Sequence, residues 1–228
     1  MAGKLYGIGV GPGDPELMTI KALKTMKACD VIAIPGKNPS ESVAYRIAEG
    51  AYPEINEKEQ LLITTPMTKD LKVLNDAYKK GAEAIEKLLD EGKSVGLLTL
   101  GDPTIYSTYI YVHRNVIQDG YEAEIINGIP SFCAVSAKFG DSLVDRDEPL
   151  HVIPASYQIE DALELPGTKV LMKAASKLSE VKQTLKEQGC QAMMIENCGM
   201  PDERIYRSTD EIPEKGSYYS LTVIKNRK

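Results

Sequence analysis

Residues 95–107 read VGLLTLGDPTIYS, so an apolar run from Val95 to Leu100 is followed directly by Gly101-Asp102-Pro103. The run is short and uninterrupted, which is typical of a strand buried on both faces of a parallel sheet. Glycine at its end leaves the backbone uncovered by a side chain. Open α/β sheets bind ligands at the carboxyl ends of their strands. We therefore expect residues 101–107 to form a ligand-binding loop.

A second glycine-rich loop lies near the N-terminus, where a predicted strand is followed by residues 9–15, GVGPGDP. The loop departs from the dinucleotide-binding pattern GxGxxG. The sixth place holds Pro12 when counted from Gly7, and Asp14 when counted from Gly9. Its prolines also remove N–H donors that a phosphate would use. The loop therefore favours a neutral or cationic ligand over a phosphate.

Composition limits the class of protein. The chain has 228 residues, 43% of them hydrophobic, and a net charge of −6, so it can fill two modest cores. An acidic balance argues against binding to nucleic acid or to a membrane surface. No apolar run approaches the ~20 residues that cross a bilayer, and the N-terminus shows no export signal. We expect a cytoplasmic protein with no nucleic-acid or membrane partner.

The potential metal ligands are scattered. The chain has four cysteines and two histidines, without the tight spacing of metal or disulfide frameworks: Cys29, Cys133, Cys190, Cys198, His113 and His151. We expect buried free thiols and no metal site.

Predicted strands and helices alternate along the chain, which indicates an α/β fold with a largely parallel sheet in the first half. Shorter strands with hairpin-like spacing predict a mixed sheet in the second half. The break is expected at Asp119-Gly120, giving domains 1–119 and 120–228. The predicted elements are strands at 5–9, 31–34, 95–100, 123–127, 151–154, 169–172, 192–196 and 218–224, and helices at 19–27, within 67–92, at 131–139 and at 179–188.

Four loops follow predicted strands and carry glycine or proline: Gly11–Pro15, Gly101–Ser107, Gly128–Phe132 and Asn197–Pro201. Each alone is a weak signal, because glycine and proline mark turns in every protein. Together they predict one ligand site in which the turns at residues 11, 101, 128 and 199 converge.

In the order and composition of these loops, the chain resembles the tetrapyrrole methylase family. The matching segments are Gly9–Pro15 with Leu17 and Thr19, Leu100–Pro103 with Tyr106-Ser107, Gly128–Phe132, Val170–Lys173 and Glu196–Pro201. Within the family it is most similar to the branch that methylates C-20 of precorrin-2 or cobalt-factor II in cobalamin biosynthesis. That likeness rests on Ser42–Ala48, Pro66–Asp70, Tyr106–Thr108 and Leu171–Lys173.

The resemblance implies two α/β domains, S-adenosylmethionine in the cleft between them, a homodimer and a tetrapyrrole substrate. It implies that Pro12 lines the cleft and that Gly101, Asp102 and Tyr106 hold the amino-acid part of the cofactor. The further contacts that it implies are Ser131, Phe132, Met172 and Cys198. By residue type alone, Asp102 could accept a hydrogen bond from the ammonium group or shape its own loop as an Asx turn.

The substrate poses a charge problem, since corrin precursors carry many carboxylates and the chain is net acidic. Cations must therefore gather locally. The first candidates are Arg46, Lys173 and Arg114, and the second candidates are Lys37 and Arg146. Methylation at C-20 also removes a proton. His113, Asp14 and Tyr106 could accept it by type, as could water, so the catalytic residue stays unknown.

Three rival functions remain from other classes. A nicotinamide-dependent oxidoreductase would place an acidic residue after the second strand, where Pro35-Gly36 stands instead. An RNA-modifying relative would need a basic stripe. A nucleotide-sensing module would bind without catalysis. Within the family, another corrin ring position is the alternative target.

Overall fold

The computed structural model describes residues 2–154, 159–174 and 177–225. The chain divides into two compact units, unit 1 (Met1–Pro130) and unit 2 (Ser131–Lys228).

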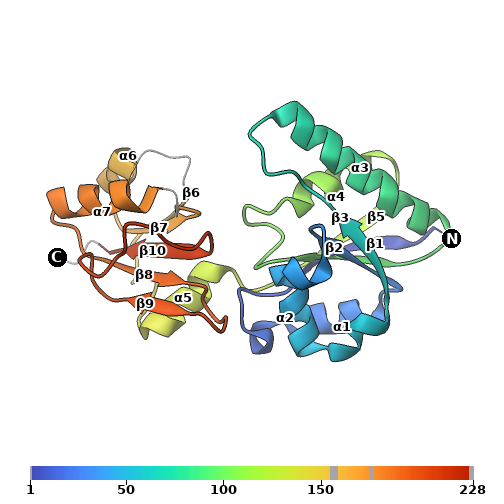
Figure 1. The fold of residues 1–228 in the computed structure, drawn as a ribbon, viewed down its shortest axis with the longest axis horizontal. Helices are drawn as coiled ribbons and strands as arrows, with labels where there is room; N and C mark the ends of the chain where they lie inside the picture. The colour runs from blue at the N-terminus through green and yellow to red at the C-terminus, as the bar shows by residue number, and fades with distance from the viewer. Residues whose placement is uncertain (1, 155–158, 175–176, 226–228) are drawn as a thin grey trace. The chain divides into compact units, whose positions relative to one another are not determined.

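Unit 1 is built on a five-stranded sheet in which all pairs are parallel and the order is β3-β2-β4-β1-β5. Its strands are β1 (Lys4–Gly9), β2 (Val31–Pro35), β3 (Glu59–Ile63), β4 (Val95–Thr99) and β5 (Glu122–Ile126). Its helices are α1 (Ile20–Ala28), α2 (Val43–Ala51), α3 (Leu71–Asp90) and α4 (Tyr109–Gln118), with 3-10 turns η1 (Pro15–Leu17), η2 (Pro39–Glu41) and η3 (Pro53–Glu57). Helices α3 and α4 lie on one face of the sheet, and α1 and α2 lie on the other (Figure 1).

The burial of β4 agrees with its central place in the sheet. Every residue of β4 is buried, as the apolar run at 95–99 requires, and β4 lies at the centre between β2 and β1. Gly7 in β1 is needed for packing, because a Cβ there would lie 2.0 Å from the Tyr109 ring of α4. The strand thus leaves room for a buried aromatic side chain from the covering helix.

Unit 2 has a mixed five-stranded sheet of order β6-β7-β10-β8-β9. Strands β6 and β7 are parallel, whereas β10 runs antiparallel to both β7 and β8. The elements are α5 (Ser131–Phe139), β6 (Leu150–Pro154), α6 (Ile159–Glu164), β7 (Thr168–Met172), α7 (Leu178–Glu187), β8 (Ala192–Glu196), β9 (Arg204–Tyr206) and β10 (Ser220–Ile224). Helices α6 and α7 contribute Leu163, Leu178 and Leu185 to the core of this unit.

The expected fold class is confirmed, with a parallel sheet first and a mixed sheet second. The units divide after Pro130, so the break expected at Asp119-Gly120 falls inside unit 1. The reason is strand pairing, since β5 hydrogen-bonds along β1 and completes the first sheet.

Candidate functional site

Three of the four predicted loops meet at the carboxyl edge of the sheet in unit 1. Gly101 N–H donates to the Gly11 carbonyl at 2.8 Å, and Gly11 N–H donates back at 3.3 Å. Both glycines have positive φ, +83° and +70° for Gly11 and Gly101, which a side chain would strain. A Cβ on Gly128 would lie 2.1 Å from the Gly101 carbonyl oxygen. Backbone therefore packs on backbone, and the loops after β1, β4 and β5 converge.

The Asp102 carboxylate lies at the centre of this arrangement, and the residue as a whole is 5% exposed. Its Oδ1 accepts hydrogen bonds from the backbone N–H of Thr104 at 2.7 Å and from the Thr104 hydroxyl. Its Oδ2 accepts from Asn127 Nδ2 at 3.1 Å and from Gly128 N–H at 3.0 Å. The Asx turn that sequence reasoning left open is therefore present.

These bonds stabilise the ionised form of the acid. Burial alone would raise the pKa of Asp102, but the hydrogen bonds from Thr104, Asn127 and Gly128 outweigh it and hold the pKa below its ordinary value. The edge of the sheet thus carries a fixed negative charge.

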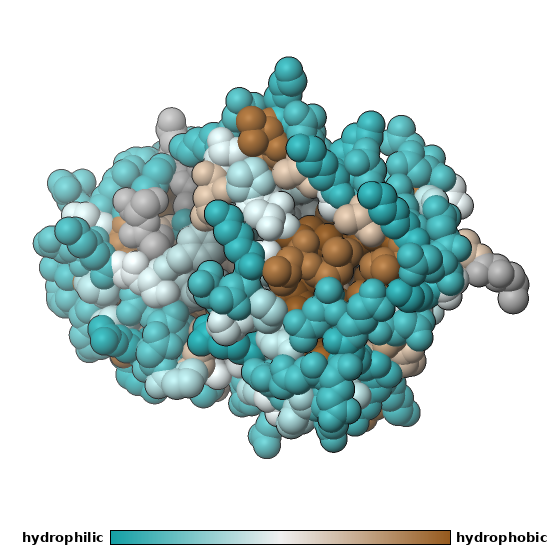
Figure 2. All heavy atoms as spheres, turned by 45° about the vertical axis from the view of Figure 1, so that its right-hand side comes forward, coloured by the Kyte–Doolittle hydropathy of each residue, from teal (hydrophilic) through white to brown (hydrophobic). Residues whose placement is uncertain are grey.

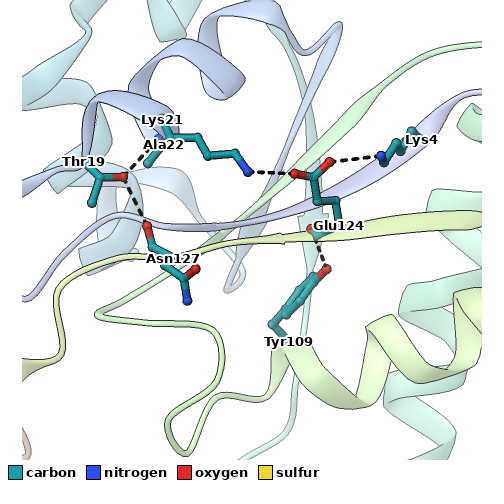
Figure 3. A network of polar contacts seen from close by, with 7 residues as sticks. All are labelled: Lys4, Thr19, Lys21, Ala22, Tyr109, Glu124 and Asn127. Carbon is teal, nitrogen blue, oxygen red and sulfur yellow. Dashed lines mark hydrogen bonds and ion pairs between the residues drawn. The ribbon is translucent and has the colours of Figure 1, made fainter.

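Asn127 links this carboxylate to the start of α1. The Thr19 hydroxyl donates to the Asn127 carbonyl at 3.1 Å and accepts from Ala22 N–H, which caps the helix (Figure 3). In the same view, Glu124 bridges Lys4 and Lys21 at 3.0 and 2.9 Å. Side chains on β1, α1 and β5 therefore hold the end of β5 in place.

Tyr106 and Pro12 flank the three loops. Tyr106 has a φ of +47° and is 47% exposed. A positive φ is uncommon for an aromatic residue, and such strain clusters at functional sites. Pro12 is buried and follows the Gly11 bridge directly. Both residues lie at the edge where the sequence places them.

In unit 2 the other predicted contacts lie near the carboxyl ends of β7 and β8, or at the start of α5. Both strands flank the beginning of β10, since Leu221 pairs with Met172 and Ser220 with Glu196. The residues that follow the strands, Lys173 and Asn197, have φ values of +59° and +51°.

The loop after β8 is held by its own side chains. Asn197 Nδ2 donates to Asp202 at 2.8 Å, and its Oδ1 accepts from the Ser217 hydroxyl at 2.7 Å. Cys198 is buried beside it. Ser131 and Phe132 open α5, with Phe132 buried and Ser131 half-buried.

The three cationic candidates are exposed by surface area, although desolvation of the ammonium group lowers the pKa of Lys173. Arg46 lies in the first turn of α2, Arg114 in the second turn of α4, and Lys173 directly after β7. A helix that follows a parallel strand begins near the carboxyl edge, so Arg46 in the first turn of α2 is on the side of unit 1 where the loops meet, whereas Arg114 lies further along its helix.

The three candidate bases lie in different settings. His113 Nδ1 shares a hydrogen bond with the Tyr109 hydroxyl at 2.8 Å. Burial lowers the pKa of His113, and the nearby Arg114 lowers it further. Asp14 caps η1 by accepting from Glu16 N–H, while Tyr106 stands exposed. These contacts do not identify any one of the three as the catalytic base.

Sequence reasoning missed the residues that support the site, namely Thr104, Asn127 and the capping role of Thr19. Thr104 stands two places after Asp102, which is the spacing of an Asx turn and could have been used. Asn127 carries no such local signal. Among the described residues, no three of His, Cys, Asp and Glu are grouped so as to hold a metal ion.

Comparison with known proteins gives consistent results. A profile of the family described as Tetrapyrrole (Corrin/Porphyrin) Methylases matches residues 4–212. The chain is 36% identical to a probable cobalt-precorrin-2 C(20)-methyltransferase of Methanocaldococcus jannaschii, over 99% of this chain and 97% of that one. It is 30% identical to a precorrin-2 C(20)-methyltransferase of a Sinorhizobium species, over 97% and 95%.

Solved structures share the fold. A cobalt precorrin-4 methyltransferase superposes with a TM-score of 0.74 at 21% identity, covering 97% of this chain and 94% of that one. A uroporphyrin-III C-methyltransferase of Thermus thermophilus, in complex with S-adenosylhomocysteine, superposes with a TM-score of 0.70 at 20% identity, covering 98% of each chain. The profile match spans both units and the sequence relatives are matched almost end to end, so this chain belongs to the tetrapyrrole methylase family.

Proposed function

We propose that the protein transfers a methyl group from S-adenosylmethionine to C-20 of precorrin-2 or of its cobalt form, a step of cobalamin biosynthesis. The observation that carries the proposal is the identity, over nearly the whole chain, to two proteins named as C(20)-methyltransferases. The named C(11)-methyltransferase of Methanocaldococcus jannaschii is more distant, at 27% identity.

The edge of unit 1 suits this methyl donor. It offers backbone without a side chain at Gly11 and Gly101, both of positive φ, and Gly128 packs on Gly101 too closely for a side chain. S-adenosylmethionine carries no phosphate, which agrees with a loop that contains prolines in place of N–H donors. The proposed contacts are Pro12, Gly101 and Tyr106 in unit 1 and Ser131, Phe132, Met172 and Cys198 in unit 2, with Asp102 holding the loop that carries Gly101.

When bound, S-adenosylmethionine supplies a methyl group that is already electrophilic. The chain therefore needs mainly to orient the donor and the accepting carbon and to exclude water. Holding two reactants in attack geometry can remove about 7–11 kcal/mol from a barrier. Rigid loops suit that task, and the bonds around Asp102 make the loops after β4 and β5 rigid.

We assign the substrate carboxylates to Arg46, Arg114 and Lys173. Their exposed positive charges would offset the acidic balance of the chain. Replacing each with Met should raise the KM for the tetrapyrrole and leave the affinity for S-adenosylhomocysteine unchanged. A matched control is Lys24→Met on α1, an exposed cation outside the site, which should alter neither.

The deciding experiment is mass spectrometry of precorrin-2 and its cobalt form after incubation with enzyme and methyl donor, with the added carbon located. A methyl group at C-20 supports the proposal. A methyl group at another position would reject C-20 and keep the family chemistry. Calorimetry should show binding of S-adenosylmethionine and S-adenosylhomocysteine but not of NAD. A nucleotide-sensing module would bind without turnover.

We also propose a homodimer. Large apolar side chains are exposed near the end of β3 and the start of α3, with Met67 91% and Leu71 73% exposed. Hydrophobic residues also gather in one area of the surface among hydrophilic ones (Figure 2). Exposed apolar patches commonly mark protein interfaces.

Sedimentation tests the dimer. Changing both Met67 and Leu71 to Glu should give a monomer, whereas Ile20→Glu, on an equally exposed apolar residue of α1, should leave the dimer intact. A monomeric wild-type protein would rule the dimer out.

We further propose a cytoplasmic location. The cysteines of the chain, all within its described part, form no disulfide, whereas proteins of oxidising compartments commonly pair theirs. Among the described helices, none is both long and apolar enough to cross a membrane. Cell fractionation would check the location.

A further inference from the structure

The hydrogen-bonding capacity of the Asp102 carboxylate is already used within the chain. An ionised carboxylate offers about four lone-pair sites on its two oxygens. Thr104 donates twice to Oδ1, and Asn127 and Gly128 donate once each to Oδ2. The residue as a whole is 5% exposed. A ligand ammonium group could bond to this carboxylate only by displacing one of its four donors.

The partners of Asp102 come from distant parts of the chain. Thr104 belongs to its own loop, but Asn127 and Gly128 follow β5, 25 and 26 residues later. The Asn127 carbonyl also accepts from Thr19 at the start of α1. One carboxylate thus joins the loop after β4 to the loop after β5, and Asn127 extends the link to the segment after β1.

Gly128 shows why this link matters for geometry. Its Cα packs against backbone, and a Cβ would lie 2.9 Å from the carbonyl carbon of Gly9. Since backbone contacts this close tolerate little movement, the bond from Gly128 N–H to Asp102 sets the spacing between the two glycine loops. An unmade bond here would leave a partly buried charge and a donor unsatisfied.

We propose that Asp102 is a positioning residue, which fixes the glycine loops through Asn127, Gly128 and Thr104 and does not itself contact the ammonium group of the methyl donor. The proposal rests on the proposed function, because it concerns how the same site is held. It assigns recognition of the amino-acid part to the backbone of the loops.

A ligand pair separates positioning from contact. Calorimetry compares S-adenosylhomocysteine with its analogue that lacks the amino group, for the wild type, Asp102→Ala and Asn127→Ala. If Asp102 positions the loops, Asp102→Ala should weaken both ligands by about 10- to 100-fold. The ratio of their two affinities should stay within about twofold of the wild type. Asn127→Ala should weaken both in the same way, by a smaller factor.

The control is Asp70→Ala, because Asp70 caps α3 by accepting from Lys72 and Val73 N–H. It removes two backbone hydrogen bonds to an exposed Asp elsewhere in unit 1 and should leave both affinities unchanged. The proposal is overturned if Asp102→Ala brings the affinity ratio down by about tenfold or more, which would reveal a direct carboxylate–ammonium contact. An effect of Asp102→Ala without any effect of Asn127→Ala would also overturn it.

Amide exchange gives a readout that needs no ligand. Asp102→Ala and Asn127→Ala should both speed the exchange of the Gly128 amide, and Asp70→Ala should not. Unchanged exchange at Gly128 would overturn the positioning role. If the wild type binds neither ligand, the proposed function fails, and the exchange data alone decide whether Asp102 positions the loops.

Discussion

Gly128 is a residue where a single methyl group should disturb the site. Its Cβ would lie 2.1 Å from the Gly101 carbonyl oxygen, so Gly128→Ala must push two loops apart. Overpacking of this kind costs about 1–3 kcal/mol. We expect urea unfolding to show a loss of about 3 kcal/mol, and calorimetry to show at least about tenfold weaker binding of S-adenosylhomocysteine.

Gly120 is the matched comparison. Its φ is +94°, but a Cβ there would have no neighbour within 4 Å. Gly120→Ala should therefore cost only the backbone strain, about 1 kcal/mol, and retain ligand affinity. Equal losses for the two variants would show that the crowding at Gly128 relaxes without consequence.

Glu86 on α3 should make stability depend on pH. Burial raises the pKa of Glu86, and the nearby carboxylate of Asp119 raises it further. The folded state then holds this proton more tightly than the unfolded state, so stability is lost as pH rises through the raised pKa. Glu86→Gln should increase the Tm at pH 7. The gain should vanish below about pH 4, where the acid is protonated in both states.

Exposed Glu54 in η3 provides the control, since Glu54→Gln should change the Tm little at either pH. A Glu86→Gln variant with an unchanged Tm at pH 7 would contradict the interpretation of this cluster of carboxylates.

At the level of single residues, the sequence predicts the glycines of the site better than it predicts the side chains that hold the glycine loops in place. Gly101 and Gly128 stand beside recognisable turns. The partners of Asp102 beyond its own loop lie 25 and 26 residues away, and no spacing rule connects them. The hydrogen bonds of Asp102 to Asn127 and Gly128 depend on which strands become neighbours, and that is decided only when the sheet forms.

At the level of elements, the C-terminus of α1 is capped by a lysine side chain from another segment of the chain. Lys58 Nζ donates to the carbonyls of Cys29 and Lys27 at 2.6 and 3.0 Å. A cation at a helix C-terminus satisfies its last carbonyls and the helix dipole. Lys58→Met should therefore lower the free energy of unfolding by about 1–2 kcal/mol, as measured in urea.

Lys24, exposed on the same helix, makes no such bond among the described contacts, and Lys24→Met should change stability by less than about 0.5 kcal/mol. Similar effects of the two substitutions would mean that the cap contributes nothing measurable.

Most elements could be predicted because their patterns are strong. The apolar run at 95–99 is strand β4, and the periodic stretch within 67–92 contains α3. Strand β3 is not predictable from the sequence, since Glu59, Gln60 and Leu62 are exposed at the edge of the sheet and only three apolar residues, 61–63, follow the polar Glu59 and Gln60. Edge strands bury too little to leave an alternating pattern.

At the level of the whole molecule, the boundary between the units depends on β5. Residues 4–8 of β1 pair with residues 122–126, and Ile126 is 1% exposed. The Asp119-Gly120 pair marks only the turn between α4 and β5. The sequence reveals the turn, but the parallel pairing that keeps β5 in unit 1 is a long-range contact.

Two fragments would test where the first folding unit ends. Residues 1–130 contain the whole parallel sheet, its order β3-β2-β4-β1-β5 and the core shared with α3 and α4. This fragment should unfold cooperatively on heating, as followed by circular dichroism. Residues 1–119 lack β5, which leaves one side of β1 unpaired and removes two of the donors to Asp102. The shorter fragment should therefore show no cooperative transition, and equal Tm values for both would mean that β5 is not part of the unit that folds.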